Sequence, residues 1–273
     1  MDNNHLQKVF NDIVENYLKT YSITKPSKYC ENYVPNEVVA IFETNRSFER
    51  TTKWIINNLS KEKRNEKISE AADYTFVIVL ESPHTDEFNI NRNNDGFGDH
   101  PAIGDTGKNI EEYFIDYVNK YVPSVRSSND STTYLKKGDI SSGKYRLILV
   151  NLINFQCSLG AKPEEHRKII IDKLLSYEEN GIKIFSDFFI NEIRKYKPDV
   201  VLNACTANFK PHVWQLIDSL SLKAVELESN HPVNWGNDFN CIYNRRAALT
   251  NVSEKRKKKN CCIKKLVEKC KKH

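Results

Sequence analysis

Four short apolar segments, separated by amphipathic stretches, constrain the fold of this chain more than any other feature of its sequence. They are rich in Val, Ile, Leu and aromatic residues and lie at 74–80, 145–150, 199–202 and 223–227. Apolar runs without alternation are typical of parallel strands that are buried on both faces of a sheet. Helical periodicity appears between them, at 108–121, 164–175, 184–196 and 211–219. This order predicts a three-layer α/β/α sandwich with a four-stranded parallel sheet.

The chain before the first apolar segment has a helical pattern. Apolar residues recur at helical spacing at Leu6, Val9, Phe10, Ile13, Val14 and Tyr17. Val38, Val39 and Phe42 begin a second pattern that we also interpret as helical. We therefore predict an N-terminal helical extension over 1–72, an α/β/α core over 73–252 and a basic tail over 253–273.

The positive charge of the chain is concentrated in that tail. The net charge is +5, yet residues 253–273 hold ten Lys or Arg and two Glu, which gives the tail +8 and the remainder about −3. A basic run such as the one around Lys257 is typical of segments that bind nucleic-acid phosphates. It is equally typical of a solvated end that aids solubility, and the charge pattern leaves both interpretations open.

Several classes of protein are disfavoured by the composition. No apolar run reaches the length of about eighteen residues that a membrane span needs. The first residues are polar and lack the order of a signal peptide, so we expect a cytoplasmic protein. The seven cysteines are odd in number and form no C-x-x-C pair, which argues against a disulfide framework or a zinc ribbon.

Polar residues follow three of the four predicted strands. Glu81 follows the first strand, Asn151 the second and His231 the fourth. Each alone has a structural explanation, because acids cap helices, amides stabilise turns and His-Pro pairs are common in turns. Ligands of open parallel sheets bind beyond the carboxyl ends of the strands. An acid, an amide and an imidazole arriving there together predict an active site.

Five segments in this order resemble the uracil-DNA glycosylase superfamily, nearest its iron–sulfur-bearing bacterial and archaeal branch. The Gly-Glu-Ala-Pro-Gly motif of that branch corresponds to LESPH, and its Gly-rich loop corresponds to DHPAIGDTGKNIEEYF. The strand that ends in Asn corresponds to LVNLINFQCSLGAKPEEHR, and the strand led by Lys-Pro corresponds to EIRKYKPDVVLNA. The final His-Pro-Ser motif corresponds to SNHPVNWG. The resemblance covers roughly residues 73–236.

The resemblance implies a role for each matching residue. Glu81 would activate water and stabilise an oxocarbenium-like sugar, and His231 would stabilise the departing base. Residues expected to contact the base are Ser82, His84, Ala102 and Asn151. Residues expected to contact DNA are Gly104, Gly107, Lys108, Asn234 and Trp235, with Trp235 entering the duplex or stacking on a base. Lys257 joins them on the ground of its place in the basic tail and not of the resemblance.

Three departures from the family pattern alter the expected target. The aromatic residue that stacks on uracil is Ala102 here, the Gly that closes the first motif is His84, and the Ser of the last motif is Val233. These changes imply a larger or more polar base, such as the hypermodified cytosines of phage DNA, and hence a role in anti-phage defence. Excision of plain uracil in base-excision repair is the alternative.

The expected cofactors and partners follow from the same comparison. The branch binds its cluster with an N-terminal cysteine pair and two further cysteines, whereas only Cys157 lies near such a position here. We therefore expect no iron–sulfur cluster, no metal and no other cofactor. DNA, single- or double-stranded, is the expected partner, with no membrane and no obligatory protein partner.

Two other classes of function remain open. The first is a metal-dependent hydrolase on a similar sandwich, with ligands drawn from Glu81, His84, Asp86, Asp99, His100 and His231. The second is a non-catalytic nucleic-acid-binding module that keeps the fold. Retention of Glu81, Asn151 and His231 together favours an enzyme over a module that only binds.

Overall fold

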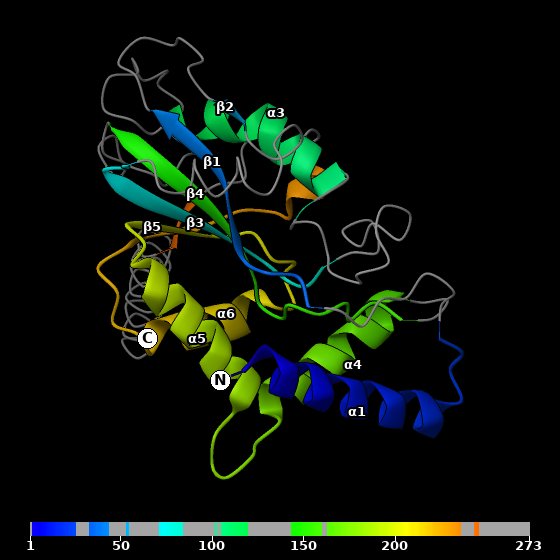
Figure 1. Cartoon of the computed structure of the whole chain (residues 1–273). Helices are drawn as coiled ribbons and strands as arrows, with labels where there is room; N and C mark the ends of the chain where they lie inside the picture. The colour runs from blue at the N-terminus through cyan, green and yellow to red at the C-terminus, as the bar shows by residue number, and fades with distance from the viewer. Residues whose placement is uncertain are drawn as a thin grey trace, which may run out of the picture.

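The computed structural model describes residues 2–25, 33–43, 53–54, 71–83, 102, 105–119, 143–159, 163–235 and 243–245. Within these ranges the chain has an α/β fold with one mixed, mostly parallel sheet (Figure 1). Its five main strands are β1 (Glu37–Glu43), β3 (Tyr74–Leu80), β4 (Lys144–Asn151), β5 (Val200–Asn203) and β6 (Val225–Glu228). Two-residue strands, β2 (Lys53–Trp54) and β7 (Tyr243–Asn244), extend the sheet, whose order is β2-β1-β4-β3-β5-β6-β7.

The four predicted strands form the parallel centre of the sheet, which confirms this part of the prediction. β4, β3, β5 and β6 pair in parallel, with Leu80 opposite Asn151 and Val79 opposite Asn203. This register brings the residues that follow the strands to one edge of the sheet.

The prediction of a second N-terminal helix around Val38 is wrong. Residues 37–43 form β1, which pairs antiparallel with β4 and places Phe42 opposite Tyr145. Val38, Val39 and Ala40 are all buried. β-Branched and aromatic residues suit a strand that is covered on both faces, and this burial outweighs the spacing that fits a helix.

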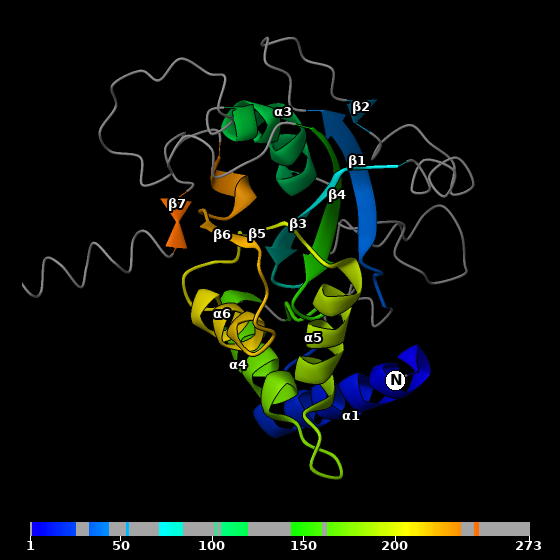
Figure 2. The same cartoon turned by 90° about the vertical axis from the view of Figure 1, so that its left-hand side faces the viewer.

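Five α-helices flank the sheet in the described part of the chain. They are α1 (Asn3–Tyr21), α3 (Asp105–Asn119), α4 (Pro163–Ser176), α5 (Ile184–Tyr196) and α6 (Lys210–Asp218), and a 3₁₀ turn, η2, spans Pro232–Asn234. α3 lies on one face, and α4, α5 and α6 lie on the other with α1 outside them (Figures 1 and 2). No helix in the described ranges is both long and apolar enough to cross a bilayer.

The core lies on both sides of the sheet because alternate side chains of each strand point to opposite faces. Val77 and Val79 of β3 pack with α1, α4, α5 and α6. Phe76 and Ile78 pack with α3. The continuous apolar runs of the sequence therefore supply two cores at once.

The first helix packs against α4 and against the segment that joins β4 to α4. Phe10 of α1 stacks on Phe155, with ring centroids 4.6 Å apart. The hydroxyl of Tyr17 lies 2.9 Å from Nδ1 of His166, in the second turn of α4. α1 is thus part of the packed structure and supports the helix that carries the neighbouring Arg167.

Candidate active site

Glu81 follows β3 directly, and its side chain is only 3% exposed. Its Oε1 atom accepts a hydrogen bond from the backbone N–H of Thr206, beyond β5. Its Oε2 atom lies 3.3 Å from Nε of Arg167 on α4. Oε2 is buried and accepts no hydrogen bond within the described ranges, since the Arg167 contact is an ion pair alone. The carboxylate is therefore fixed at one oxygen, while the other is left without a donor.

Asn151 occupies the last position of β4, next to the end of β3. The residue is 2% exposed, and its backbone N–H donates to Oδ1 of Asn36 over 3.0 Å. Its Nδ2 atom is buried and has no hydrogen-bond acceptor among the described residues. Buried polar groups in native proteins are normally paired. Two buried polar atoms without a partner, Nδ2 of Asn151 and Oε2 of Glu81, thus lie at the ends of neighbouring strands, as expected where a polar ligand binds.

Asn36 holds this part of the edge in place. Its Oδ1 atom also accepts from Nδ2 of Asn154 over 2.8 Å, and its own Nδ2 donates to Glu192 over 3.2 Å. Nδ2 of Asn154 additionally donates to the carbonyl of Val34 over 2.7 Å. The segment before β1 therefore positions Asn151 through side-chain hydrogen bonds.

His231 immediately precedes η2. Its Nδ1 atom accepts a 3.4 Å hydrogen bond from the backbone N–H of Val233. Burial lowers the pKa of the imidazole, the charge of Glu81 raises it, and the charge of Arg167 lowers it further. The charges of Glu81 and Arg167 therefore act on the ring in opposite directions.

Asn109 of α3 fixes the turn after His231. Its Nδ2 atom donates to the carbonyl oxygens of Pro232 and Val233 over 2.9 and 3.1 Å. The helix on one face of the sheet is thereby tied to the loop that carries the imidazole.

Trp235 occupies a different position from the one predicted. Its side chain is fully buried among the residues that pack under α3, and its indole N–H donates to the carbonyl of Asn230 over 2.8 Å. This placement contradicts a role as a wedge or stacking residue for DNA, because the ring is part of the core. Asn234 and Val233 are the exposed residues of this turn.

Ala102 and Gly107 contact each other at the start of α3. Ala102 is buried with a φ of 58°, and a Cβ atom on Gly107 would clash with its carbonyl oxygen. A glycine is therefore needed at position 107 because the chain packs closely against itself there. The resemblance predicted a contact of Gly107 with DNA and did not indicate this packing. Lys108 is exposed and lies 3.6 Å from Asp105.

Two thiols lie close to the carboxylate. Cys157 and Cys205 are free and buried, and burial raises the pKa of each thiol. Ser82 hydrogen-bonds to Cys157. Both thiols therefore remain protonated near neutral pH.

Some predicted residues lie outside the described ranges. They are His84, Gly104 and Lys257, together with Asp86, Asp99 and His100 of the metal-hydrolase alternative. Among the residues that the structure does describe, no group of three His, Cys, Asp or Glu could hold a metal ion.

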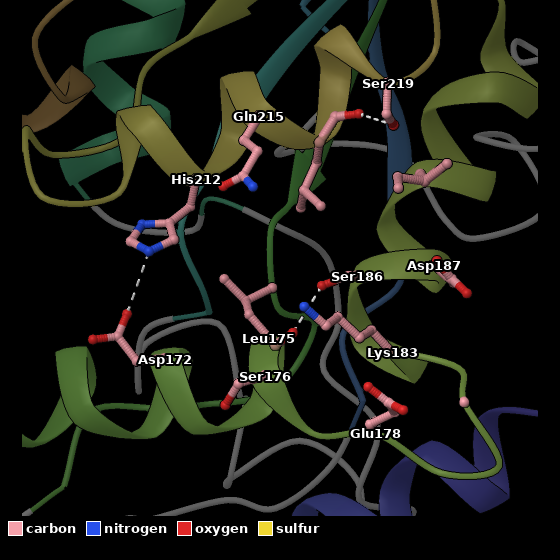
Figure 3. Close-up of a pocket in the computed structure, with 13 residues that line it drawn as sticks. Asp172, Leu175, Ser176, Glu178, Lys183, Ser186, Asp187, His212, Gln215 and Ser219 are labelled. Carbon is pink, nitrogen blue, oxygen red and sulfur yellow. Dashed lines mark hydrogen bonds and ion pairs between the residues drawn. The ribbon is translucent and has the colours of Figure 1, made fainter.

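Two cavities lie away from this edge. The larger, of about 550 Å³, opens between α4, α5 and α6, where His212 faces Asp172 at 3.8 Å (Figure 3). The smaller, of about 420 Å³, lies between α1 and the end of α4. Neither is lined by Glu81, Asn151 or His231.

The sequence interpretation missed the residues that organise this site. Arg167 pairs with Glu81, Asn36 holds Asn151, and Asn109 holds the turn after His231.

Comparison of the chain with protein-family models, curated proteins and solved structures finds no match. The chemistry of the site therefore rests on its own groups: a buried carboxylate, an unpaired amide and an imidazole.

Proposed function

We propose that this protein is a DNA glycosylase, which hydrolyses the N-glycosidic bond of a flipped nucleotide and leaves an abasic site. The supporting observation is the buried pair of unsatisfied groups at adjacent strand ends, Oε2 of Glu81 and Nδ2 of Asn151. One is an acceptor and the other a donor, as recognition of water and of a base edge requires.

Glu81 has the surroundings of a group that binds water and opposes positive charge. Oε1 is occupied by the N–H of Thr206, so Oε2 remains to accept a hydrogen bond from the attacking water. As the glycosidic bond stretches, the sugar gains oxocarbenium character, which a carboxylate stabilises.

His231 is suited to the departing base. Because Nδ1 accepts the N–H of Val233, the neutral ring carries its proton on Nε2. Burial lowers the pKa of the imidazole, with opposing influences from Glu81 and Arg167, and this favours the neutral form. The Nε2–H group then donates to the base as negative charge develops on it, in the manner of an oxyanion hole.

Asn151 would read the edge of the extruded base. Its unpaired Nδ2 would donate to a carbonyl oxygen of a pyrimidine, and an amide side chain also carries an oxygen that can accept. Enzymes that act on a base in this way take it out of the helical stack.

The target that we propose is a bulky or polar pyrimidine, such as a hypermodified cytosine of phage DNA. The support is the identity of Ala102, His84 and Val233, where the resembling family has an aromatic residue, Gly and Ser. A small side chain in place of a ring gives up stacking of about 1–3 kcal/mol and leaves more room. An anti-phage role follows from such a target.

Base release from defined DNA tests this proposal. The protein is incubated with oligonucleotides that contain uracil, 5-hydroxymethylcytosine or glucosylated 5-hydroxymethylcytosine, and alkali then cleaves at abasic sites. We expect cleavage at the modified cytosines, undiminished by EDTA. Release of uracil alone would overturn the target but keep the reaction class. Intact strands with every substrate would overturn the glycosylase itself.

A further inference from the structure

The carboxylate of Glu81 and the guanidinium of Arg167 form a pair that is buried on one side only. The Glu81 side chain is 3% exposed and the Arg167 side chain is 24% exposed. Nε of Arg167, which faces Oε2 of Glu81, is itself buried without a hydrogen bond. The inner end of the guanidinium is thus committed to the carboxylate.

The Nη groups at the outer end of the guanidinium are hydrogen-bond donors that Glu81 does not use. Arginine carries five N–H donors, and Glu81 is the only ion-pair partner that Arg167 has among the described residues. The Arg167 side chain is 24% exposed, and of its nitrogens only Nε is both buried and without a hydrogen bond. An arginine with free, accessible Nη groups matches the geometry of a phosphate, which it binds through two parallel hydrogen bonds.

The position of Arg167 in the fold suits a phosphate of the DNA strand. α4 begins at Pro163, shortly after β4 ends at Asn151, and Arg167 lies in the early turns of this helix. Its contact with Glu81 places it at the edge of the sheet where the parallel strands end. The charge of Arg167 acts on His231 as well as on Glu81. A phosphate approaching this edge would meet the negative charge of Glu81, which the guanidinium offsets.

We propose that Arg167 binds a backbone phosphate next to the flipped nucleotide with its Nη groups while its Nε side positions Glu81. This inference rests on the proposed function, because the phosphate belongs to the DNA strand that the site would process. Arg167 is a positioning residue for the reaction and a binding residue for the strand.

A binding experiment separates this role from a structural one. Replacing Arg167 alone leaves a buried charge unpaired and endangers folding. The comparison is therefore between Glu81→Gln and the double variant Glu81→Gln/Arg167→Met, which removes both charges. The probe is a fluorescein-labelled duplex that contains a tetrahydrofuran abasic analogue, with Kd measured by anisotropy over 50–200 mM salt.

We expect the double variant to bind about tenfold more weakly than Glu81→Gln. The slope of log Kd against log salt should fall by about one, as for the loss of one phosphate contact. Glu81→Gln/Arg167→Lys should keep the slope, since a point charge remains. The matched control is Glu81→Gln/Lys168→Met, which removes a cation from the next position of α4, where Lys168 pairs with Asp172 at 2.8 Å. This control should bind like Glu81→Gln.

The positioning role is tested by turnover with Glu81 intact. Arg167→Lys should lower the single-turnover rate at saturating DNA by about tenfold or more while leaving the salt slope unchanged. Equal Kd and slope for Glu81→Gln and Glu81→Gln/Arg167→Met, with base release by the wild type, would overturn the role of Arg167 and leave the glycosylase standing. A wild type that releases no base would overturn the proposed function instead.

Discussion

Nε of Arg167 lies 3.3 Å from Oε2 of Glu81 and so connects α4 to the end of β3. The backbone N–H of Thr206 reaches the other oxygen of the same carboxylate. A buried charge with no partner costs several kcal/mol. The pairing therefore explains how an acid can stand at this edge of the sheet and still present one oxygen to a ligand.

Removal of the Glu81 charge should abolish most of the activity without unfolding the protein. Glu81→Gln keeps an oxygen for the N–H of Thr206 but loses the negative charge that, in the proposed reaction, would oppose the sugar cation. We expect the single-turnover rate of base release to fall by about 10²- to 10⁴-fold. Glu15→Gln, which changes an exposed carboxylate on α1, is the control and should match the wild type. A Glu81→Gln rate within threefold of the wild type would rule out the assigned role.

The pH dependence of stability should reveal the buried imidazole of His231. Burial lowers its pKa from the ordinary value of about 6.5, Glu81 raises it and Arg167 lowers it. Between the lowered pKa and 6.5 the unfolded chain binds more protons than the folded one, so stability falls as the pH falls through this window. Urea unfolding at pH 7.5 and 5.5 measures the loss, which should be smaller in His231→Asn than in the wild type.

The same titration should set the acid limb of base release. In the proposed reaction the neutral ring would donate from Nε2 while Nδ1 accepts from Val233, so we expect the rate to stay flat through pH 6.5 and to decline only below it. A rate already halved at pH 6.5 or above would contradict this assignment.

Loss of the Asn36 side chain should destabilise the fold and impair the site together. Asn36→Ala would leave the N–H of Asn151 without its acceptor and remove one of the two acceptors of Asn154 Nδ2. Each unsatisfied buried group costs about 1–3 kcal/mol, so we expect the free energy of unfolding to drop by about 2 kcal/mol. Asn16→Ala, at an exposed position of α1, should change it by less than about 0.5 kcal/mol. Equal denaturation midpoints for the two variants would show that the hydrogen bonds of Asn36 do not stabilise the fold.

Gly107→Ala should disturb the start of α3 more than an alanine at an open glycine. The new Cβ would clash with the backbone oxygen of Ala102, which has to move. We expect a loss of about 1–3 kcal/mol in stability, and reduced base release because Asn109 on the same helix holds the turn after His231. Gly181→Ala is the control: its φ of +79° adds strain of about 1 kcal/mol, but nothing lies within 4 Å. A Gly107→Ala protein as stable as Gly181→Ala would contradict the predicted clash.

Sequence patterns correctly predicted those helices and strands whose conformation depends mainly on their own residues. The apolar run at Tyr74–Leu80 and the helical period at Ile184–Tyr196 have the predicted bounds in the structure. In both, propensity and burial favour the same conformation. At Glu37–Glu43 they conflict, because the spacing of Val38, Val39 and Phe42 fits a helix while the composition fits a strand. The deciding factor is pairing with β4, about a hundred residues further along the chain.

The candidate site was only partly predictable for the same reason. Ligand sites of open parallel sheets lie beyond the carboxyl ends of the strands, and this rule alone predicts Glu81 and Asn151 at one edge of the sheet. The parallel pairing of β3 with β4 places them there. Arg167 stands in the segment PEEHRK, which has the composition of a solvated helix, and nothing nearby marks its contact with Glu81. Trp235 shows the opposite error, because an aromatic residue after a functional motif is as readily a core residue.

Among the residues that the structure describes, the outer strands of the sheet, β2 and β7, span two residues each. A long outer strand offers a row of free backbone groups to which a second molecule can add its own strand, whereas a very short one offers almost none. Because β1 occupies the side of β4 that would otherwise be open, the long central strands are closed to such addition. A strand from a second molecule could therefore add to β4 only if β1 first left the sheet.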